Sequence, residues 1–357
     1  MNEYQGREKR RGLCTREAAQ QLEVERCPVS ASAPAIRDGA IPIQHYLKGT
    51  YYTAKFTQEG FRKGIDYLNQ AIALDPTYAD AYSALAYNYI NQDDWFIPPA
   101  HSAPKARAAA LKALSLEEGD VGAHVALVIE TDWYEWDWAG ADREFRRALE
   151  IDPVDGDALG YYSWFLPSMG RGEEAVEQAR LQTKTYPLSF GAYGNLGSVF
   201  VFTQRWDEAI TQLRYAIDLN PHYWFDYYFL GRAYEQKGQF PLAIQTFRKG
   251  LELEGNTELW AALAHALAVS GNITEARKVL DQLNELAKQR YVAPYNFALV
   301  YRALGDIDAA FASLERAFEA RSYLLAVYLN TDARLKSLYS DPRYDNLRRR
   351  MKLPRSM

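Results

Sequence analysis

The feature that most constrains the fold of this chain is an internal repeat with a period of about 34 residues. Prolines, alanines and loop glycines recur at this interval, within one residue. They are Pro153, Pro187 and Pro221; Ala175, Ala209, Ala243, Ala276 and Ala310; and Gly238, Gly271 and Gly305. A fixed period of this length with helical patterning is typical of a solenoid built from helix–turn–helix units.

Each recurring residue has a physical reason to be where it is. A small residue in the middle of a helix lets the partner helix approach closely. The loop glycine suits the positive φ that often ends a helix, and the proline terminates the second helix because it cannot continue one. A single helix pair cannot bury its apolar face, so the pairs are expected to stack into a continuous core.

These residues resemble the tetratricopeptide repeat family. The copy that runs from YGNLGSVF (193–200) to RWDEAITQLRYAIDLNP (205–221) matches its pattern of bulky, small and aromatic positions closed by a proline. About eight copies extend from roughly residue 43 to residue 322. The resemblance implies an all-α, right-handed α-solenoid of about eight helix–turn–helix repeats.

The chain divides into three predicted parts. Residues 1–42 contain VSASAPAIRDGAIP, a small-residue run interrupted by prolines, and are expected to be an irregular segment or linker. Residues 43–337 are predicted to form the superhelix. Residues 338–357 are predicted to form a C-terminal capping helix and tail. SDPRYDNLRRRM supplies an N-cap, a proline at the first helical position, and an apolar face on Tyr344, Leu347 and Met351.

The resemblance extends to one bacterial group. YLKG (46–49), AIALDPTYADAYSALA and the closing SDPRYDNLRRR look like the C-terminal repeat arms of regulators with a winged-helix, kinase or cyclase effector domain. Residues 1–42 are too short for such an effector. The resemblance therefore implies a regulatory or interaction module of a bacterial protein that stands without its effector domain.

Composition narrows the classes of partner. The net charge is −5 and no basic stripe follows the repeats, so neither nucleic acid nor a membrane is expected as a partner. No apolar run approaches the length of a membrane span, and no signal peptide begins the chain, which favours a cytoplasmic location. Cys14 and Cys27 match no metal or redox spacing, so no metal and no cofactor are expected.

The sequence contains no local motif typical of catalysis. It has no phosphate-binding glycine loop, no nucleophile elbow and no helix-borne histidine pair. We therefore expect no catalytic residues and favour a protein that is not an enzyme.

A binding surface is expected on the concave side, where the first helices of the pairs face inward. Positions one packing residue away from the buried small residue are aromatic or of mixed charge. The predicted groove residues are Tyr87, Asn91, Trp164, Tyr228, Arg232, Glu235, His265, Tyr295 and Arg302. Tyr, Trp and Arg dominate binding hot spots, so the leading interpretation is a scaffold that binds a protein or peptide in this groove.

Three alternatives stay open. The aromatic residues could instead fill the interior of the superhelix and contact one another. The groove around Trp164 could hold a small molecule, which would make the chain a sensing module. A carboxylate or His265 in the groove could serve a cryptic hydrolase. Under the leading interpretation, Arg232→Ala weakens partner binding and costs little stability.

Overall fold

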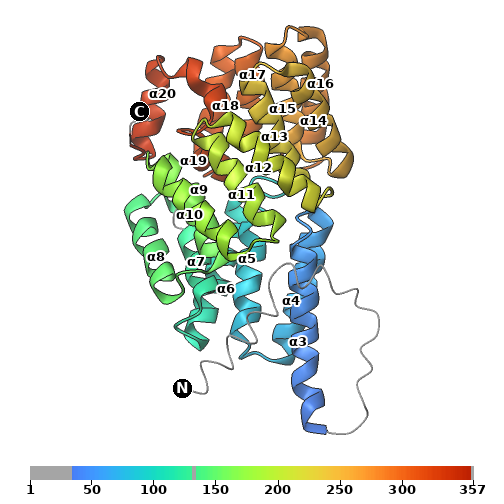
Figure 1. Ribbon diagram of the computed structural model, residues 1–357, viewed down its shortest axis with the longest axis vertical. Coiled ribbons are helices and arrows are strands. Elements are labelled where there is room, and N and C mark those ends of the chain that lie inside the picture. Colours follow the sequence, from blue (N-terminus) through green and yellow to red (C-terminus); the bar gives the residue numbers. More distant parts are fainter. Residues whose placement is uncertain (1–33, 131–133, 355–357) are drawn as a thin grey trace.

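The part of the chain that the structure describes forms a solenoid of eight antiparallel helix pairs (Figure 1). A computed structural model describes residues 34–130 and 134–354. The pairs in chain order are α3 (Pro34–Thr53) with α4 (Gln58–Leu74), α5 (Ala79–Ile90) with α6 (Pro99–Leu116), α7 (Val121–Glu130) with α8 (Trp138–Ile151), α9 (Gly156–Ser168) with α10 (Gly172–Thr185), α11 (Phe190–Phe202) with α12 (Trp206–Leu219), α13 (Trp224–Gln236) with α14 (Phe240–Leu253), α15 (Thr257–Val269) with α16 (Ile273–Ala287), and α17 (Pro294–Ala303) with α18 (Ile307–Glu319). The predicted all-α solenoid is confirmed.

The small residues of the repeat allow the close approach that the period predicts. A Cβ added at Gly231 would lie 2.3 Å from the Phe247 ring, and one added at Gly197 would lie 2.5 Å from the Leu213 side chain. The alanines of the same series, from Ala175 to Ala310, are fully buried. Small residues at these positions therefore set the spacing between the two helices of a pair.

The N-terminal boundary differs from the expected one. Residues 1–33 lie outside the described residues. Residues 34–42 belong to α3, which begins at Pro34 and contains Pro42. Proline is tolerated at the first position of a helix because the N–H it lacks has no intrahelical partner there.

The C-terminal part also differs from a simple repeat array. After α18 the chain passes through the short helix α19 (Tyr323–Tyr328) and the 3₁₀-helix η2 (Ala333–Leu338) before it forms α20 (Pro342–Arg350). Apolar side chains of α19 and η2 are fully or almost fully buried: Leu324, Leu325, Tyr328, Leu335 and Leu338. These two elements are therefore part of the core rather than a further repeat.

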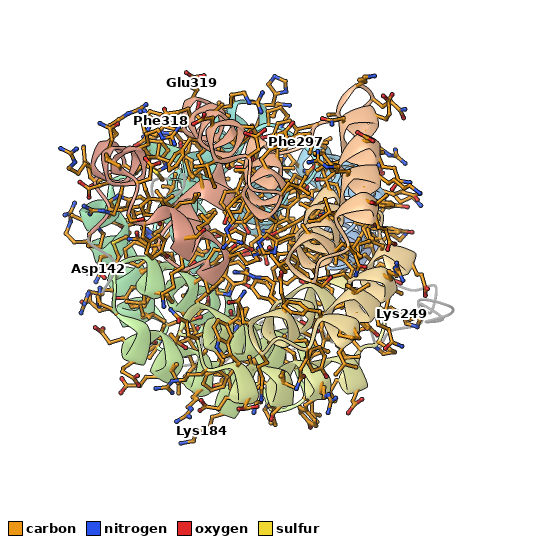
Figure 2. All side chains as sticks on the ribbon, turned by 90° about the horizontal axis from the view of Figure 1, so that it is seen from above. Asp142, Lys184, Lys249, Phe297, Phe318 and Glu319 are labelled. Carbon is orange, nitrogen blue, oxygen red and sulfur yellow. The ribbon has the colours of Figure 1, made fainter. Side chains whose placement is uncertain are left out.

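Residues far apart in the sequence meet across the interior of the solenoid. In the view down the long axis, side chains fill this interior (Figure 2). The Trp224 indole Nε1 donates to the Phe56 carbonyl oxygen at 2.9 Å. At the other end of the chain, the Trp138 indole on α8 donates to the carbonyl oxygen of Met351, directly after α20, at 2.6 Å. The solenoid is thus closed by contacts between its two halves.

Within the described residues, no helix combines the length and the apolar character needed to cross a lipid bilayer.

Candidate functional site

Most of the predicted groove residues lie in the interior and not on an open surface. Six of them meet around the C-terminal segment: Tyr228, Arg232, Glu235, His265, Tyr295 and Arg302. Five are at most 4% exposed, and Arg302 is partly exposed. These six side chains share one face, as the helical phase predicts, but α19 and η2 cover this face.

Asp332, at the N-terminus of η2, is the centre of this cluster. Its carboxylate accepts hydrogen bonds from the Tyr295 hydroxyl at 2.9 Å and from the Arg334 Nη2 at 2.7 Å, and it lies 3.4 Å from the Arg232 Nη2. Arg334 also donates to the Tyr228 hydroxyl at 3.0 Å. Burial alone would raise the pKa of Asp332, but the charges of the two arginines outweigh it and hold the pKa well below its usual range. We call these five residues the Asp332 cluster.

A second chain of polar contacts runs from the interior to the surface. The His265 Nδ1 hydrogen-bonds to the Glu235 carboxylate, and the His265 Nε2 lies 3.2 Å from the Arg302 Nη1. The Arg302 Nε donates to the Ser337 hydroxyl at 2.9 Å. Arginine has only donors, so the Nε2 of His265 accepts and the Nδ1 carries the proton. Neither ring nitrogen remains available to take a proton from a nucleophile.

Two further buried carboxyl groups, on α13 and α15, were not among the predicted residues either. Glu258 on α15 is 2% exposed, and burial raises its pKa to about 7 although the charge of Arg232 opposes the shift. Burial also raises the pKa of Asp226 on α13 well above its usual value. Glu258 lies seven residues before His265, which is two turns on the same helix face, so helical phase could have identified it.

The other three predicted residues lie elsewhere. Trp164 packs in an aromatic core, with its ring 5.1 Å from that of Phe202 and 5.6 Å from that of Phe225. Asn91 accepts a hydrogen bond from the Tyr161 hydroxyl at 2.8 Å, and the Tyr87 ring lies 5.9 Å from the Tyr161 ring. The alternative that the aromatic residues contact one another therefore describes Trp164 well.

The loop that interrupts the early repeats also closes the interior. Asp94, at φ 60°, accepts hydrogen bonds from the Tyr291 hydroxyl at 2.5 Å, from the Leu324 backbone N–H at 3.0 Å, and from the Ser322 hydroxyl. It thereby holds the N-terminus of α19. The neighbouring Trp95 packs its ring 4.9 Å from Phe225.

Displacing the C-terminal segment to open a groove would cost too much free energy. Burial of the six large aliphatic side chains of this segment is worth roughly 9–18 kcal/mol. They are Leu324, Leu325, Val327, Leu329, Leu335 and Leu338. A partner with micromolar affinity contributes only about 8 kcal/mol. The concave interior is therefore a packed core that an ordinary ligand does not enter.

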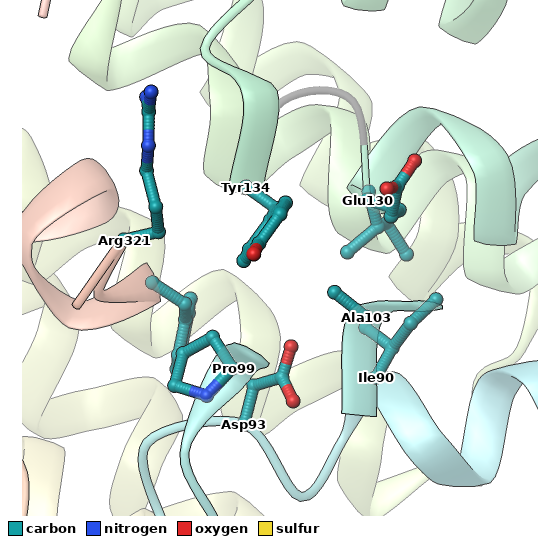
Figure 3. Close-up of a pocket in the computed structure, with 9 residues that line it drawn as sticks. Ile90, Asp93, Pro99, Ala103, Glu130, Tyr134 and Arg321 are labelled. Atoms are coloured by element: carbon teal, nitrogen blue, oxygen red, sulfur yellow. The ribbon is translucent and has the colours of Figure 1, made fainter. Parts of the chain in front are cut away.

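A small cavity lies beside the Asp94 loop (Figure 3). Its volume is about 10 Å³, and Asp93, Glu130, Tyr134 and Arg321 are among the residues that line it. Burial, followed by the charges of Asp94 and Glu130, raises the pKa of Asp93 well above its usual value. This volume has room for about one water molecule and for no organic substrate.

A larger hollow lies on the outer surface between α12 and α14, over α13. Its volume is about 780 Å³. Apolar side chains of Ile217, Tyr227, Leu230 and Ile244 line it, and charged residues of α12 and α14 surround them. This volume is within the usual range of ligand pockets, and we call it the outer groove.

Comparison with known proteins supports the repeat assignment. Residues 195–256 and 230–290 match one tetratricopeptide repeat family model, and residues 295–323 match another. These segments are tetratricopeptide repeats. The crystal structure of the APC/C hetero-tetramer Cut9–Hcn1 has a similar fold, with a TM-score of 0.60, 16% identity, and coverage of 94% of this chain and 58% of that chain.

Two curated relatives also carry similar sequence. Superkiller protein 3 of Schizosaccharomyces pombe is 20% identical over 307 residues, which are 82% of this chain and 22% of that protein. BBSome complex member BBS4 of Xenopus tropicalis is 27% identical over 150 residues, which are 41% of this chain and 29% of that protein. This chain therefore spans less than a third of the length of either relative.

Proposed function

We propose that this tetratricopeptide repeat chain is a protein-interaction scaffold that binds its partners on the outer surface of a closed solenoid. The observation that carries the proposal is the packed interior. Residues 323–338 bury the Asp332 cluster, so the partner surface has to be sought on the outer helices. Tetratricopeptide repeats are typical protein-interaction modules, and one relative is named as a BBSome complex member.

The finer part of the proposal is that the scaffold serves a bacterial regulatory system as its interaction arm. Its support is the likeness of several stretches, among them YLKG (46–49) and SDPRYDNLRRR (340–350), to the repeat arms of such regulators. A rigid, closed body suits this role because it presents a fixed surface and loses little conformational entropy on binding.

The two alternatives gain no support from the geometry of the predicted groove. His265, the candidate base, has one ring nitrogen facing Glu235 and the other facing Arg302. Trp164, the proposed wall of a small-molecule site, is 8% exposed and packs against Phe202 and Phe225.

The test of the scaffold function is capture followed by reconstitution. The full chain is immobilised and exposed to extract of the cells that produce it, and each enriched protein is then purified and titrated against the chain by calorimetry. We expect at least one direct complex with micromolar or tighter affinity. If no purified candidate binds, while a metabolite screen shows a ligand-dependent rise in melting temperature, the small-molecule alternative replaces this proposal.

A further inference from the structure

The outer helices carry a row of arginines that has the period of the repeat. One arginine occupies the same position, five residues after the buried alanine or its equivalent, in four consecutive second helices. They are Arg146 on α8, Arg180 on α10, Arg214 on α12 and Arg248 on α14, each 34 residues from the next. All four side chains are exposed. We call them the arginine row.

Figure 2 places the helices of the arginine row on the perimeter of the molecule. The labelled side chains of Asp142, Lys184 and Lys249, which α8, α10 and α14 carry, extend outward from the ring of helices. The row therefore runs along the outer wall and is separated from the Asp332 cluster by the first helices of the repeats.

The present partners of the arginine row are weak and exchangeable. Arg146 lies 3.0 Å from Asp142, and its side chain is 55% exposed. Arg248 lies 2.6 Å from Glu275, with both side chains about half exposed. Ion pairs this exposed contribute little to stability, so an incoming carboxylate replaces them at low cost.

Arg214, in the middle of the row, is the best placed to bind a new anion. It forms no ion pair with a described residue. Its Nε donates to the Tyr234 hydroxyl at 2.9 Å, and its guanidinium lies over the Tyr234 ring. These contacts orient the guanidinium without neutralising its charge.

The outer groove lies between two members of the row, because both Arg214 and Arg248 line it. Its apolar floor, which includes Ile217, Leu230 and Ile244, offers a place for an apolar side chain. The charged side chains around this floor are three basic ones and two acidic ones: Arg214, Arg248, Lys249, Asp218 and Glu252. The excess of positive charge around an apolar floor is complementary to a segment that carries an apolar residue between acidic ones.

We propose that the arginine row and the outer groove together bind an acidic segment of a partner protein, with its carboxylates on the arginines and an apolar side chain in the groove. The inference rests on the proposed scaffold function and specifies its surface. A protein is favoured over nucleic acid because the apolar floor of Ile217, Leu230 and Ile244 fits an apolar side chain, which a phosphate backbone does not supply.

The test uses the full chain and a defined probe. The probe is a fluorescein-labelled peptide of two Glu-Glu-Leu-Glu-Glu units, and its binding is measured by fluorescence anisotropy in physiological salt. We expect saturable binding. Arg214→Glu should raise the Kd about tenfold or more, whereas Arg62→Glu should leave it unchanged. Arg62 is a matched control because it lies on α4, outside the row, and is similarly exposed.

Two further probes test the role of the apolar side chain and the preference for a protein over nucleic acid. Replacing the leucines of the probe by serine should weaken binding severalfold, since the groove then has no apolar side chain to hold. A labelled single-stranded oligonucleotide of similar length should bind more weakly than the peptide. Tighter oligonucleotide binding, or equal affinity of the parent and Arg214→Glu chains for the peptide, would overturn the proposal.

The same variant distinguishes failure of this surface from failure of the scaffold function. A captured partner that binds the Arg214→Glu chain as tightly as the parent overturns the surface and leaves the function standing. Absence of any direct partner overturns the function itself. In both experiments the melting temperature of each variant is measured first, to establish that it is folded.

Discussion

Asp332 is the residue on which the interior charges converge. Its carboxylate holds Arg232, Arg334 and Tyr295 together in the buried interior. A buried ion pair adds little when it is intact, because desolvation offsets the attraction. Removal of one partner is costly, because it leaves the other charge buried and uncompensated.

Arg232→Ala should therefore lower the free energy of unfolding by about 3–5 kcal/mol. This reverses the sequence-based expectation of a small cost, which assumed that Arg232 faces a groove. The guanidinium also packs 4.8 Å from the Tyr328 ring, and that contact is lost as well. The measurement is urea unfolding. Arg214→Ala, on the exposed face of α12, is the control and should change stability by less than about 0.5 kcal/mol. Equal effects of the two substitutions would contradict the buried ion pair.

Glu258 makes stability depend on pH. Its pKa is about 7 in the folded chain against an ordinary value of 4.5. The folded state therefore binds the proton more tightly than the unfolded state. The contribution of Glu258 to the free energy of unfolding is therefore largest below pH 4.5, and it is lost as the pH rises to about 7. The loss amounts to roughly 3 kcal/mol.

Glu258→Gln should remove this part of the pH dependence. The melting temperature of the parent is expected to fall between pH 5 and pH 7.5. The melting temperature of the variant should fall markedly less over the same range. Some dependence should remain, because burial also raises the pKa of Asp226. Glu252→Gln, on the surface of α14, is the control and should follow the parent curve. Parallel curves for the parent and Glu258→Gln would show that Glu258 does not hold a proton at neutral pH.

At the scale of the element, the turn between the two helices of a pair repeats one backbone conformation. Gly170, Gly238, Gly271 and Gly305 all have positive φ between 71° and 88°. Gln204 occupies the equivalent turn between α11 and α12 at φ 60°. A residue with a Cβ is strained in this region, and glycine is not.

Gln204→Gly should therefore stabilise the chain by up to about 1 kcal/mol. The free energy gained by relieving the backbone strain exceeds the extra entropic cost of ordering glycine, which is more flexible in the unfolded chain. The reciprocal Gly238→Gln should destabilise by a similar amount, and no atom lies within 4 Å of a Cβ added there, so backbone strain alone is tested. Both are measured by thermal unfolding. Destabilisation by Gln204→Gly would mean that the side chain of Gln204 makes a contribution that outweighs the strain.

α20 shows how an element can be held by a repeated contact. Arg343 lies over the Phe311 ring at 4.2 Å and pairs with Asp308 at 2.7 Å. Seven residues on, Arg350 lies over the Phe318 ring at 3.9 Å and pairs with Glu315 at 2.8 Å. Two turns of α20 thus bind two turns of α18 in the same way. The adjoining face buries Tyr344 and Leu347, and Met351, directly after α20, is buried as well.

At the scale of the whole molecule, closure should change how the solenoid unfolds. An open repeat array is held by contacts between neighbours and can unfold in stages. Here Asp94 joins the second repeat to residues 291–324, and Trp224 reaches back to Phe56. These contacts should couple the two halves into one cooperative unit.

Asp94→Ala should cost about 3 kcal/mol or more, because it leaves several buried donors without an acceptor and places alanine at positive φ. It should also separate the unfolding curves followed by far-UV circular dichroism and by tryptophan fluorescence, which we expect to coincide in the parent. Asp94→Asn keeps one acceptor oxygen, and asparagine tolerates a positive φ. Its stability should therefore lie between that of the parent and that of Asp94→Ala. Coincident curves and an unchanged midpoint for Asp94→Ala would show that the closure contributes little.

The sequence by itself determined the helices, their pairing and the face that each turns inward. A period of 34 with small residues at Gly197, Gly231 and their equivalents admits few other packings, because each signal is local and recurs in every copy. The same phase rule grouped Tyr228, Arg232 and Glu235 on one face, and the structure keeps them together. The arginine row carries the same period and was also readable from the sequence.

Only the tertiary structure decided what that face meets. Asp332 and Arg334 lie after the last repeat, where no period marks them, and Asp94 lies in a loop that interrupts the pattern. Their positions follow from long-range packing: the interior of the solenoid is apolar enough to draw residues 323–338 inside, and the buried charges there must then find partners. Periodicity records contacts between neighbouring repeats. It carries no information on contacts between distant parts of the chain, such as that of Arg334 with Tyr228 or that of Asp94 with Leu324. Because of such contacts, the predicted binding groove is part of the core of this protein.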